Sequence, residues 1–198
     1  MKPAALILAA GYSSRMGFCK PLLEIEGRPM LILASEAFRS AGIDAIFAVT
    51  GWQHELVESC ARSAGIEPIY NPDFAEGMFS SVCTGLKALP SEYDGTFIHP
   101  VDIPFIQAGT VAALFRRAGE HPILAPRTNG RPGHPLWICR SLFDPVCAWT
   151  GAEGLRGFLQ SCSPPPFFID VADEYIFRDI DTPEDLRSIL ASRRAAGL

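Results

Sequence analysis

The sequence predicts an α/β fold: a doubly wound, mostly parallel, Rossmann-like sheet with helices on both faces. Apolar runs of strand length alternate with longer amphipathic segments along most of the chain. The first run, residues 4–9, is apolar at every position, as in a strand that is covered on both faces. The β-α-β-α-β order of the first half requires crossovers between parallel strands, and these place helices on both sides of a sheet.

The elements of the first half are bounded by glycine and proline. Gly42 and Gly65 follow the last apolar position of two amphipathic segments and end those helices, and Pro90 follows a third. The strand at residues 95–99 runs directly into Asp102. The expected elements are strands 4–9, 44–50, 66–70 and 95–99 and helices 29–41, 53–64 and 78–89.

In the second half the final helix has the clearest start. Thr182 is a suitable N-cap, Pro183 suits the first helical position, and Glu184 and Asp185 place negative charge in the first turn. The three prolines at 164–166 form a rigid connector between a helix and a strand. The expected elements are helices 107–118, 141–149, 153–161 and 182–194 and strands 122–126, 136–139, 167–171 and 175–179.

Composition describes an ordinary soluble globular protein. The 198 residues suit one domain, expected to span 1–198, and 48% of them are hydrophobic while 20% are charged. These values exclude a disordered chain. A net charge of −5 argues against a nucleic-acid partner, so a bound anion must be held by a few local donors.

The cysteines and the N-terminus both indicate a cytoplasmic protein. The six cysteines are scattered, with no C-x-x-C and no histidine at metal-ligand spacing, which favours reduced thiols over a disulfide framework. The N-terminal apolar run is short and precedes a polar segment, so we interpret it as a buried strand and not a signal sequence. No run approaches the ~20 apolar residues that a membrane helix needs.

The predicted fold also indicates where a ligand would bind. Ligands of open parallel sheets lie outside the carboxyl ends of the strands, at the point where the strand order reverses. This rule selects four places: residues 11–20, residues 71–77, Asp102 and residues 179–181.

The segment that follows the first strand has the composition of a polyphosphate-binding loop. Small residues let backbone N–H groups approach an anion, and Arg15 and Lys20 add a planar fork of donors and a point charge. It is neither a P-loop nor a dinucleotide G-x-G-x-x-G motif. A glycine- and serine-rich surface turn with two solvated cations is the alternative. The candidate nucleotide-binding residues here are Leu8, Ala9, Ala10, Gly11, Ser13, Ser14, Arg15 and Lys20.

The order of motifs resembles a known family. Residues 8–30 read Leu-Ala-Ala-Gly-x-Ser-x-Arg-Met-Gly-x-x-Lys-x-Leu-Leu-x-x-x-Gly-x-Pro-Met. This pattern is similar to the N-terminal signature of the MobA- and MocA-like transferases that attach a nucleotide to molybdopterin, and Ala10 brings it nearer to the cytidylyltransferases. Further matching blocks follow in the family's order at residues 71–86, 99–104, 131–135 and 179–186.

The resemblance implies the nucleotide-diphospho-sugar transferase type of this fold and a Mg²⁺-dependent enzyme. Such an enzyme would transfer CMP from CTP to molybdopterin and release pyrophosphate. Lys20 and Arg15 would hold the β- and γ-phosphates, and Asp102 and Asp181 would bind Mg²⁺, with Asp179 in reserve. By the same resemblance, Asn71 would touch the base or ribose, and the 77–81 segment with Ser80 and Ser81 would lie beside the nucleotide. Gly133 and His134 would face the acceptor.

Each of these residues also has a structural interpretation. Asp102 could form a turn beside proline, Asp181 precedes a helix cap, Ser80 and Ser81 could cap a helix, and His134 could make a hydrogen bond within a turn. Two departures from the family pattern, Ala152 in place of a carboxylate and the His-Pro-Val that precedes Asp102, concern the acceptor side.

The alternatives to transfer onto molybdopterin are therefore transfer onto another phosphorylated alcohol or sugar, and a non-catalytic nucleotide-binding maturation factor. Transient contact with molybdoenzyme maturation proteins is a further implication of the resemblance. Nothing in the pattern predicts a membrane partner.

Overall fold

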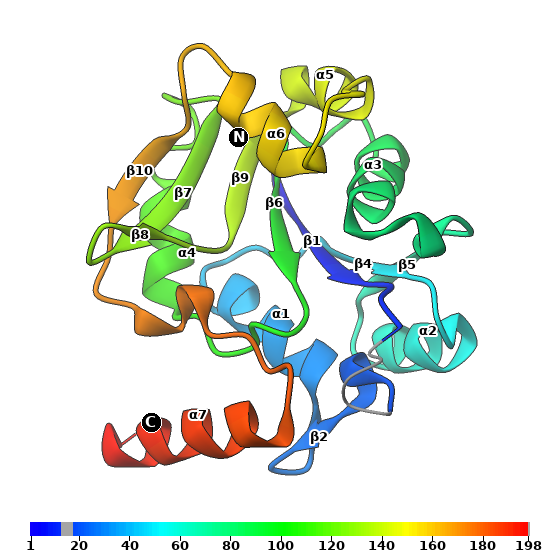
Figure 1. Ribbon diagram of the computed structural model, residues 1–198, viewed down its shortest axis with the longest axis vertical. Coiled ribbons are helices and arrows are strands. Elements are labelled where there is room, and N and C mark those ends of the chain that lie inside the picture. The colour runs from blue at the N-terminus through cyan, green and yellow to red at the C-terminus, as the bar shows by residue number, and fades with distance from the viewer. Residues whose placement is uncertain (13–17, 198) are drawn as a thin grey trace.

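The fold is built around one large sheet, which Figure 1 shows in a computed structural model that describes residues 1–12 and 18–197. Among these residues, seven strands follow one another by hydrogen bonding, and a short strand, β8 (Arg131–Pro132), pairs with β7. In spatial order the seven are β10 (Phe167–Asp170), β7 (Ile123–Thr128), β9 (Leu136–Cys139), β6 (Gly95–Pro100), β1 (Pro3–Ala9), β4 (Ile46–Thr50) and β5 (Glu67–Tyr70).

The sheet is mostly parallel, as predicted. β1 pairs in parallel with β4 and β6, β4 pairs in parallel with β5, and β7 pairs in parallel with β10. β9 runs antiparallel to both of its neighbours, β6 and β7. The parallel half therefore carries the predicted β-α-β units, and the mixed half is joined to it through β9.

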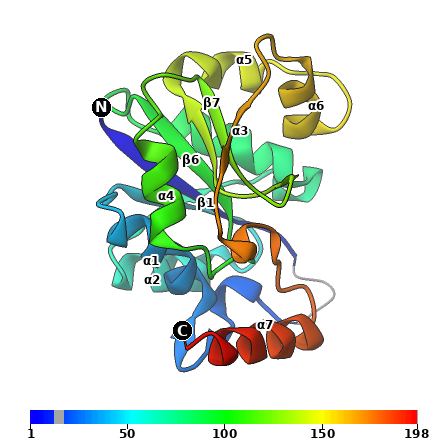
Figure 2. The ribbon, with the colours of Figure 1, turned by 90° about the vertical axis from the view of Figure 1, so that its left-hand side faces the viewer.

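Helices cover both faces of the sheet, as Figure 2 shows. Along β1, Ala5, Ile7 and Ala9 face one core, while Ala4, Leu6 and Leu8 face the other, which is the alternation of a strand buried on both sides. The first face packs against α1 (Met30–Ser40), α2 (His54–Ser63), α4 (Ala108–Phe115) and α7 (Pro183–Ala195). The second packs against α3 (Met78–Ala88), α5 (Phe143–Cys147) and α6 (Gly154–Ser161).

Short elements connect these layers. A 3₁₀ turn, η1 (Lys20–Leu22), and a hairpin of β2 (Glu24–Ile25) and β3 (Arg28–Pro29) lead into α1. Another turn, η2 (Phe74–Glu76), precedes α3, and η3 (Arg140–Leu142) precedes α5, so the helix predicted at 141–149 is divided into two pieces.

The strand predicted at residues 175–179 is wrong. This segment forms a 3₁₀ turn, η4 (Glu174–Phe177). The buried Asp173 carboxylate accepts hydrogen bonds from the backbone N–H of Tyr175 and from Gln107 N–H and the Thr110 hydroxyl at the start of α4. These bonds turn the chain around the Asp173 carboxylate and so outweigh the β propensity of the aromatic residues.

The start of α7 confirms the expected cap. The Thr182 hydroxyl accepts from Asp185 N–H, and the Asp185 carboxylate accepts from Thr182 N–H, which is a capping box with Pro183 at the first helical position. All six cysteines are free thiols. Within the described ranges, none of the helices has the length and apolar character that crossing a bilayer requires.

The connections place a crevice beside β1. From β1 the chain builds β4 and then β5 on one side, and it next returns to β6 on the other side of β1. The loops that follow β1 and β6 therefore leave the sheet side by side at its carboxyl edge, which is where the strand order reverses.

Candidate active site

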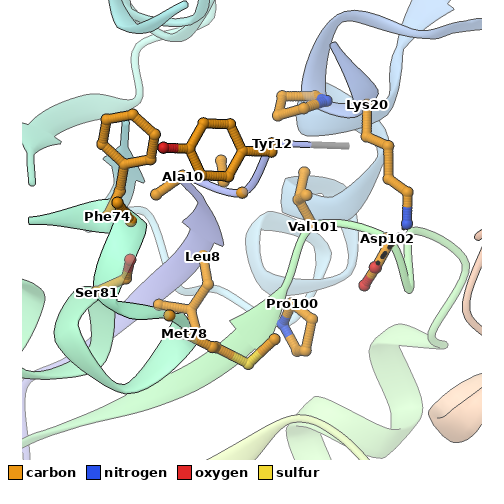
Figure 3. Close-up of a pocket in the computed structure, with 15 residues that line it drawn as sticks. Leu8, Ala10, Tyr12, Lys20, Phe74, Met78, Ser81, Pro100, Val101 and Asp102 are labelled. Atoms are coloured by element: carbon orange, nitrogen blue, oxygen red, sulfur yellow. Dashed lines mark hydrogen bonds and ion pairs between the residues drawn. The ribbon is translucent and has the colours of Figure 1, made fainter. Parts of the chain in front are cut away.

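A cavity of about 300 Å³ opens at this reversal point (Figure 3). Its walls come from the end of β1 and the loop after it, from η1, from the turn that begins α3, and from the end of β6. The described residues that line it include the predicted site residues Leu8, Ala9, Ala10, Gly11, Lys20, Ser81 and Asp102. Gly77 and Met78 belong to the segment that was predicted to lie beside the nucleotide. The other lining residues were not named as site residues, and they are Tyr12, Pro21, Phe74, Ala75, Pro100 and Val101.

Lys20 brings two segments of distant sequence together at one side of the cavity. Its Nζ donates to the Asp102 carboxylate at 3.2 Å, and it also donates to the Asp181 carboxylate. The lysine side chain is only 11% exposed, against 25% for Asp102 and 31% for Asp181. The sequence places these three residues at positions 20, 102 and 181, and the fold places both carboxylates within hydrogen-bond reach of the Lys20 ammonium.

In the described part of the chain, this cluster sets the Lys20 ammonium against two carboxylates, and these charges shift the pKa values of Lys20 and Asp102. Burial disfavours the Lys20 ammonium, but the hydrogen bond to Asp181 and the charge of Asp102 outweigh burial, so the pKa of Lys20 is raised. Burial raises the pKa of Asp102, with Lys20 opposing the shift and Asp181 and Asp179 adding to it. A half-buried carboxylate pair of this kind favours the approach of further positive charge.

Backbone hydrogen bonds fix the Asp102 turn between two other segments. Val101 N–H donates to the Leu8 carbonyl at 3.1 Å, and Ile180 N–H donates to the Asp102 carbonyl at 2.8 Å. On the other side, Asp181 N–H donates to the Asp185 carboxylate at 3.1 Å. The Asp102 turn is thus attached to β1, and Asp181 is held between this turn and the cap of α7.

The loop after β1 forms the opposite wall as far as it is described. Gly11 and Tyr12 line the cavity, and the Ala10 carbonyl accepts from Trp52 N–H at 3.1 Å. Gly51 fits between the Ala10 carbonyl and the Phe74 side chain, where an added Cβ would lie 2.6 Å from Phe74. The predicted donors Ser13, Ser14 and Arg15 lie outside the described residues.

Comparison with known proteins identifies the family of this arrangement. The family model for the MobA-like NTP transferase domain matches residues 5–165. Molybdenum cofactor cytidylyltransferase of Escherichia coli K12 is 30% identical over 184 residues, which cover 91% of each chain. The chain belongs to the family of MobA-like NTP transferases. It is therefore a nucleotidyltransferase, as the motifs predicted.

Solved structures confirm the fold of this MobA-like NTP transferase. The crystal structure of an Rv0371c homologue from Mycobacterium sp. strain JC1 has a TM-score of 0.83 at 25% identity, with 98% of each chain covered. The Rv0371c protein of Mycobacterium tuberculosis H37Rv, crystallised in complex with manganese, has a TM-score of 0.79 at 23% identity, covering 97% of this chain and 100% of that one.

Asn71 lies behind the wall of the nucleotidyltransferase cavity, and its amide is used within the protein. The residue is fully buried, and its Nδ2 donates to the hydroxyls of Ser80 and Ser81 at 2.9 and 3.0 Å. Its Oδ1 accepts from Asp73 N–H and from the Thr84 hydroxyl. This geometry favours a role for Asn71 in shaping the start of α3 over the direct contact with base or ribose that the resemblance implied.

The two serines differ in position. Ser81 is buried and lines the cavity, whereas the Ser80 hydroxyl donates to the carbonyls of Asp73 and Gly77. Gly77, with φ of 101°, is the N-cap of α3, so neither serine is the cap residue itself. Ser80 therefore closes the η2 turn, and Ser81 is the one of the pair that lines the cavity.

An aromatic and thioether surface lies at the mouth of the cavity, within the predicted segments, but the sequence analysis did not single out its side chains. The centres of the Tyr12 and Phe74 rings lie 5.0 Å apart (Figure 3). Tyr12 is 50% exposed and Met78 is 63% exposed. Tyr12 follows Gly11 and Met78 follows Gly77, so each is the first large residue after a glycine of the predicted loops. That adjacency was the available signal, but only the packing shows which large side chains remain exposed.

Gly133 and His134 are not among the lining residues. His134 N–H donates to the Ile176 carbonyl at 2.7 Å, and Gly133 packs so closely against Ile176 that a Cβ would collide with it. Burial lowers the pKa of His134 to about 4, so the ring is neutral. These contacts support the structural interpretation of the Gly-His-Pro segment, as a turn packed on η4.

Asp102 and Asp181 are the side chains that fit a divalent cation. In the part of the chain that the structure describes, no group of three or more histidine, cysteine or acidic side chains converges on one point. Mg²⁺ in nucleotide sites takes one or two carboxylates and completes its shell with phosphate oxygens and water, so a pair of carboxylates beside a phosphate-binding loop suffices.

Proposed function

We propose that this protein transfers CMP from CTP to a phosphorylated small-molecule acceptor and releases pyrophosphate, with molybdopterin as the first candidate acceptor. The convergence of Lys20, Asp102 and Asp181 at the reversal point of the sheet carries the proposal. The choice of CTP and molybdopterin is supported by the Escherichia coli relative, which covers 91% of each chain and is a molybdenum cofactor cytidylyltransferase.

The reaction needs positioning and charge neutralisation. An oxygen of the acceptor phosphate attacks the α-phosphorus of CTP, a new P–O bond forms, and the bond to the β-phosphate oxygen breaks as pyrophosphate leaves. The attacking phosphate is already ionised near pH 7, so no side chain has to remove a proton. The chain must therefore hold two anions in line and stabilise the charge that grows on the leaving group.

Named residues divide this work. The backbone of Ala10 and Gly11, with Arg15, would hold the β- and γ-phosphates, and Lys20 would neutralise the leaving pyrophosphate. Asp102 and Asp181 would hold Mg²⁺, which when bound neutralises phosphate charge. The manganese complex of the related Mycobacterium tuberculosis structure supports a divalent cation in this fold. Ser81 and the Tyr12, Phe74 and Met78 surface would contact the rest of the nucleotide.

The six free thiols fit the reducing cytoplasm, which we propose as the compartment. Delivery of a labile pterin would bring the enzyme into transient contact with molybdoenzyme maturation proteins.

Pyrophosphate release tests the activity. Purified protein with Mg²⁺ and molybdopterin should release pyrophosphate with CTP faster than with GTP or ATP, and radiolabel from α-phosphate-labelled CTP should appear on the acceptor. Asp102→Asn should abolish both signals. Release with a phosphorylated alcohol or sugar in place of molybdopterin would support the alternative acceptor, and CTP binding without turnover for every acceptor would support the non-catalytic maturation factor.

A further inference from the structure

His99 is a buried polar residue that apolar packing does not explain. It belongs to β6, is 0% exposed, and contacts the edge of Phe38 at a ring distance of 5.4 Å in the core that includes Phe97. Its Nδ1 is buried, and none of the described residues gives this atom a hydrogen-bond partner. A buried polar atom without a partner costs stability, so a leucine or methionine would serve the core better.

The other ring nitrogen of His99 makes one directed contact. Nε2 lies 2.9 Å from the Ile103 carbonyl oxygen, which can only accept, so Nε2 carries the proton. Ile103 follows Asp102 directly, and its own N–H donates to the Pro100 carbonyl. The bond from His99 therefore spans the turn that presents Asp102 and holds its far end.

Three other contacts join this turn to the neighbouring segments. The Asp102 backbone carbonyl accepts from the N–H of Ile180, the residue before Asp181, and the centre of the His134 ring lies 6.3 Å from that of the His99 ring. His134 N–H in turn donates to Ile176. The imidazole of His99 thus lies at the junction of the Asp102 turn, the His134 turn and the segment that leads to Asp181.

We propose that His99 is a positioning residue for nucleotidyl transfer: its Nε2–H fixes the Ile103 carbonyl and thereby orients the Asp102 carboxylate toward the divalent cation and Asp181. The inference rests on the proposed metal role of Asp102. When the turn that carries a carboxylate is already held in place, cation binding does not have to order that turn and costs less conformational entropy. Residues that orient metal ligands have this effect in general.

Binding of Mn²⁺ to the nucleotide-free protein, measured by the loss of the free-ion EPR signal, tests the inference without any turnover. His99→Leu should weaken Mn²⁺ binding by about 10- to 100-fold, the usual range when a group that orients a metal ligand is lost. His99→Gln should restore most of the affinity, because its amide nitrogen can reach the Ile103 carbonyl. His99→Asn, whose amide is one bond shorter, should not.

A purely structural role predicts a different outcome. Leu114→Ala removes packing from the same core at a fully buried position of α4 and should lower the melting temperature without changing Mn²⁺ affinity. If His99→Leu binds Mn²⁺ as tightly as the wild type, the positioning role is wrong. If His99→Leu does not fold, the role is wrong when the His99→Asn and His99→Gln variants bind Mn²⁺ with equal affinity. If Asp102→Asn also leaves Mn²⁺ affinity unchanged, then the proposed metal site itself is wrong.

Discussion

The Lys20 ammonium lies between the Asp102 and Asp181 carboxylates, which are the groups that would bind a divalent cation. A lysine in this place has two opposite effects. It offsets one of the two negative charges of the carboxylate pair while no nucleotide is bound, and it would be available to the triphosphate once a cation takes its place. Its removal should therefore harm turnover and help metal binding.

The variant Lys20→Met separates these effects. We expect turnover to fall on the order of a hundredfold or more, since one charge-assisted contact to the leaving group contributes about 3 kcal/mol. We expect Mn²⁺ to bind the nucleotide-free variant more tightly than the wild type, because the carboxylates lose their competing cation. Pyrophosphate release and EPR titration measure the two quantities, and Lys87→Met on the exposed side of α3 is the control. Weaker Mn²⁺ binding by Lys20→Met would show that the ammonium does not compete with the cation.

Asn71 gives a second prediction at this scale, because four hydrogen bonds within the protein hold its side chain. Asn71→Ala should lower the free energy of unfolding by about 2–3 kcal/mol, since it leaves buried partners unsatisfied. It should also raise the KM for CTP by displacing Ser81, with a smaller change in kcat. Urea unfolding and steady-state kinetics measure these effects. Thr84→Val, which removes only one of the bonds, should change the free energy of unfolding and the KM in the same directions but by less. An unchanged KM in Asn71→Ala would show that Asn71 does not affect nucleotide binding.

At the scale of elements, α7 holds Asp181 through its cap. The Asp185 carboxylate accepts from the N–H groups of both Asp181 and Thr182. Asp185→Ala should destabilise the protein by about 1 kcal/mol through loss of the capping box, and it should also weaken Mn²⁺ binding because Asp181 loses its support. Glu184→Ala lies in the same turn and is exposed, so it serves as the control for charge. Thermal unfolding together with Mn²⁺ titration checks this prediction. A loss of stability with normal Mn²⁺ affinity would show that the cap of α7 does not support the metal-binding role of Asp181.

The same element shows what local sequence can and cannot specify. The cap of α7 was predictable because Thr182, Pro183 and Asp185 act on their own neighbours in the chain. The segment at 175–179 was not, because the Asp173 carboxylate that turns it is shared with Gln107 and Thr110, more than sixty residues away. The periodicity of apolar residues cannot predict hydrogen bonds between residues that are so far apart in the sequence.

At the scale of the whole molecule, the alternation of apolar runs with amphipathic segments was enough to predict the doubly wound sheet. A strand that is buried on both faces is apolar at every position, and this can be seen in the sequence. The alternation did not predict that β9 runs antiparallel to its neighbours, because the apolar pattern of a four-residue strand does not depend on the direction in which the strand runs. For the site, the motifs located Lys20, Asp102 and Asp181, whereas the exposed surface of Tyr12, Phe74 and Met78 depends on packing between separate loops.

Acid should destabilise the whole protein through its buried histidines. Burial lowers the pKa of His99 to about 3, with the charge of His134 adding to the shift, and burial lowers that of His134 to about 4. The unfolded chain takes up these protons below about pH 6.5, so it binds more protons than the folded state and stability falls as the pH falls. Between pH 7 and pH 5, His99 alone should account for about 2 kcal/mol of lost stability.

Urea unfolding at pH 7, 6 and 5 measures this dependence. The wild type should lose stability steadily over this range, and His99→Gln should lose clearly less, because it lacks the titrating ring. An equal slope in both proteins would mean that His99 is not held neutral by the fold.

The central claim is that Lys20, Asp102 and Asp181 form one site for a triphosphate and its divalent cation. A crystal structure with Mn²⁺ and a CTP analogue that has a methylene group between its α- and β-phosphates tests it most directly. We expect an anomalous difference peak bridging the Asp102 and Asp181 carboxylates and the phosphates, with the Lys20 ammonium moved onto the β- or γ-phosphate. A manganese peak elsewhere, or a nucleotide bound while Lys20 keeps both carboxylates, would contradict the account.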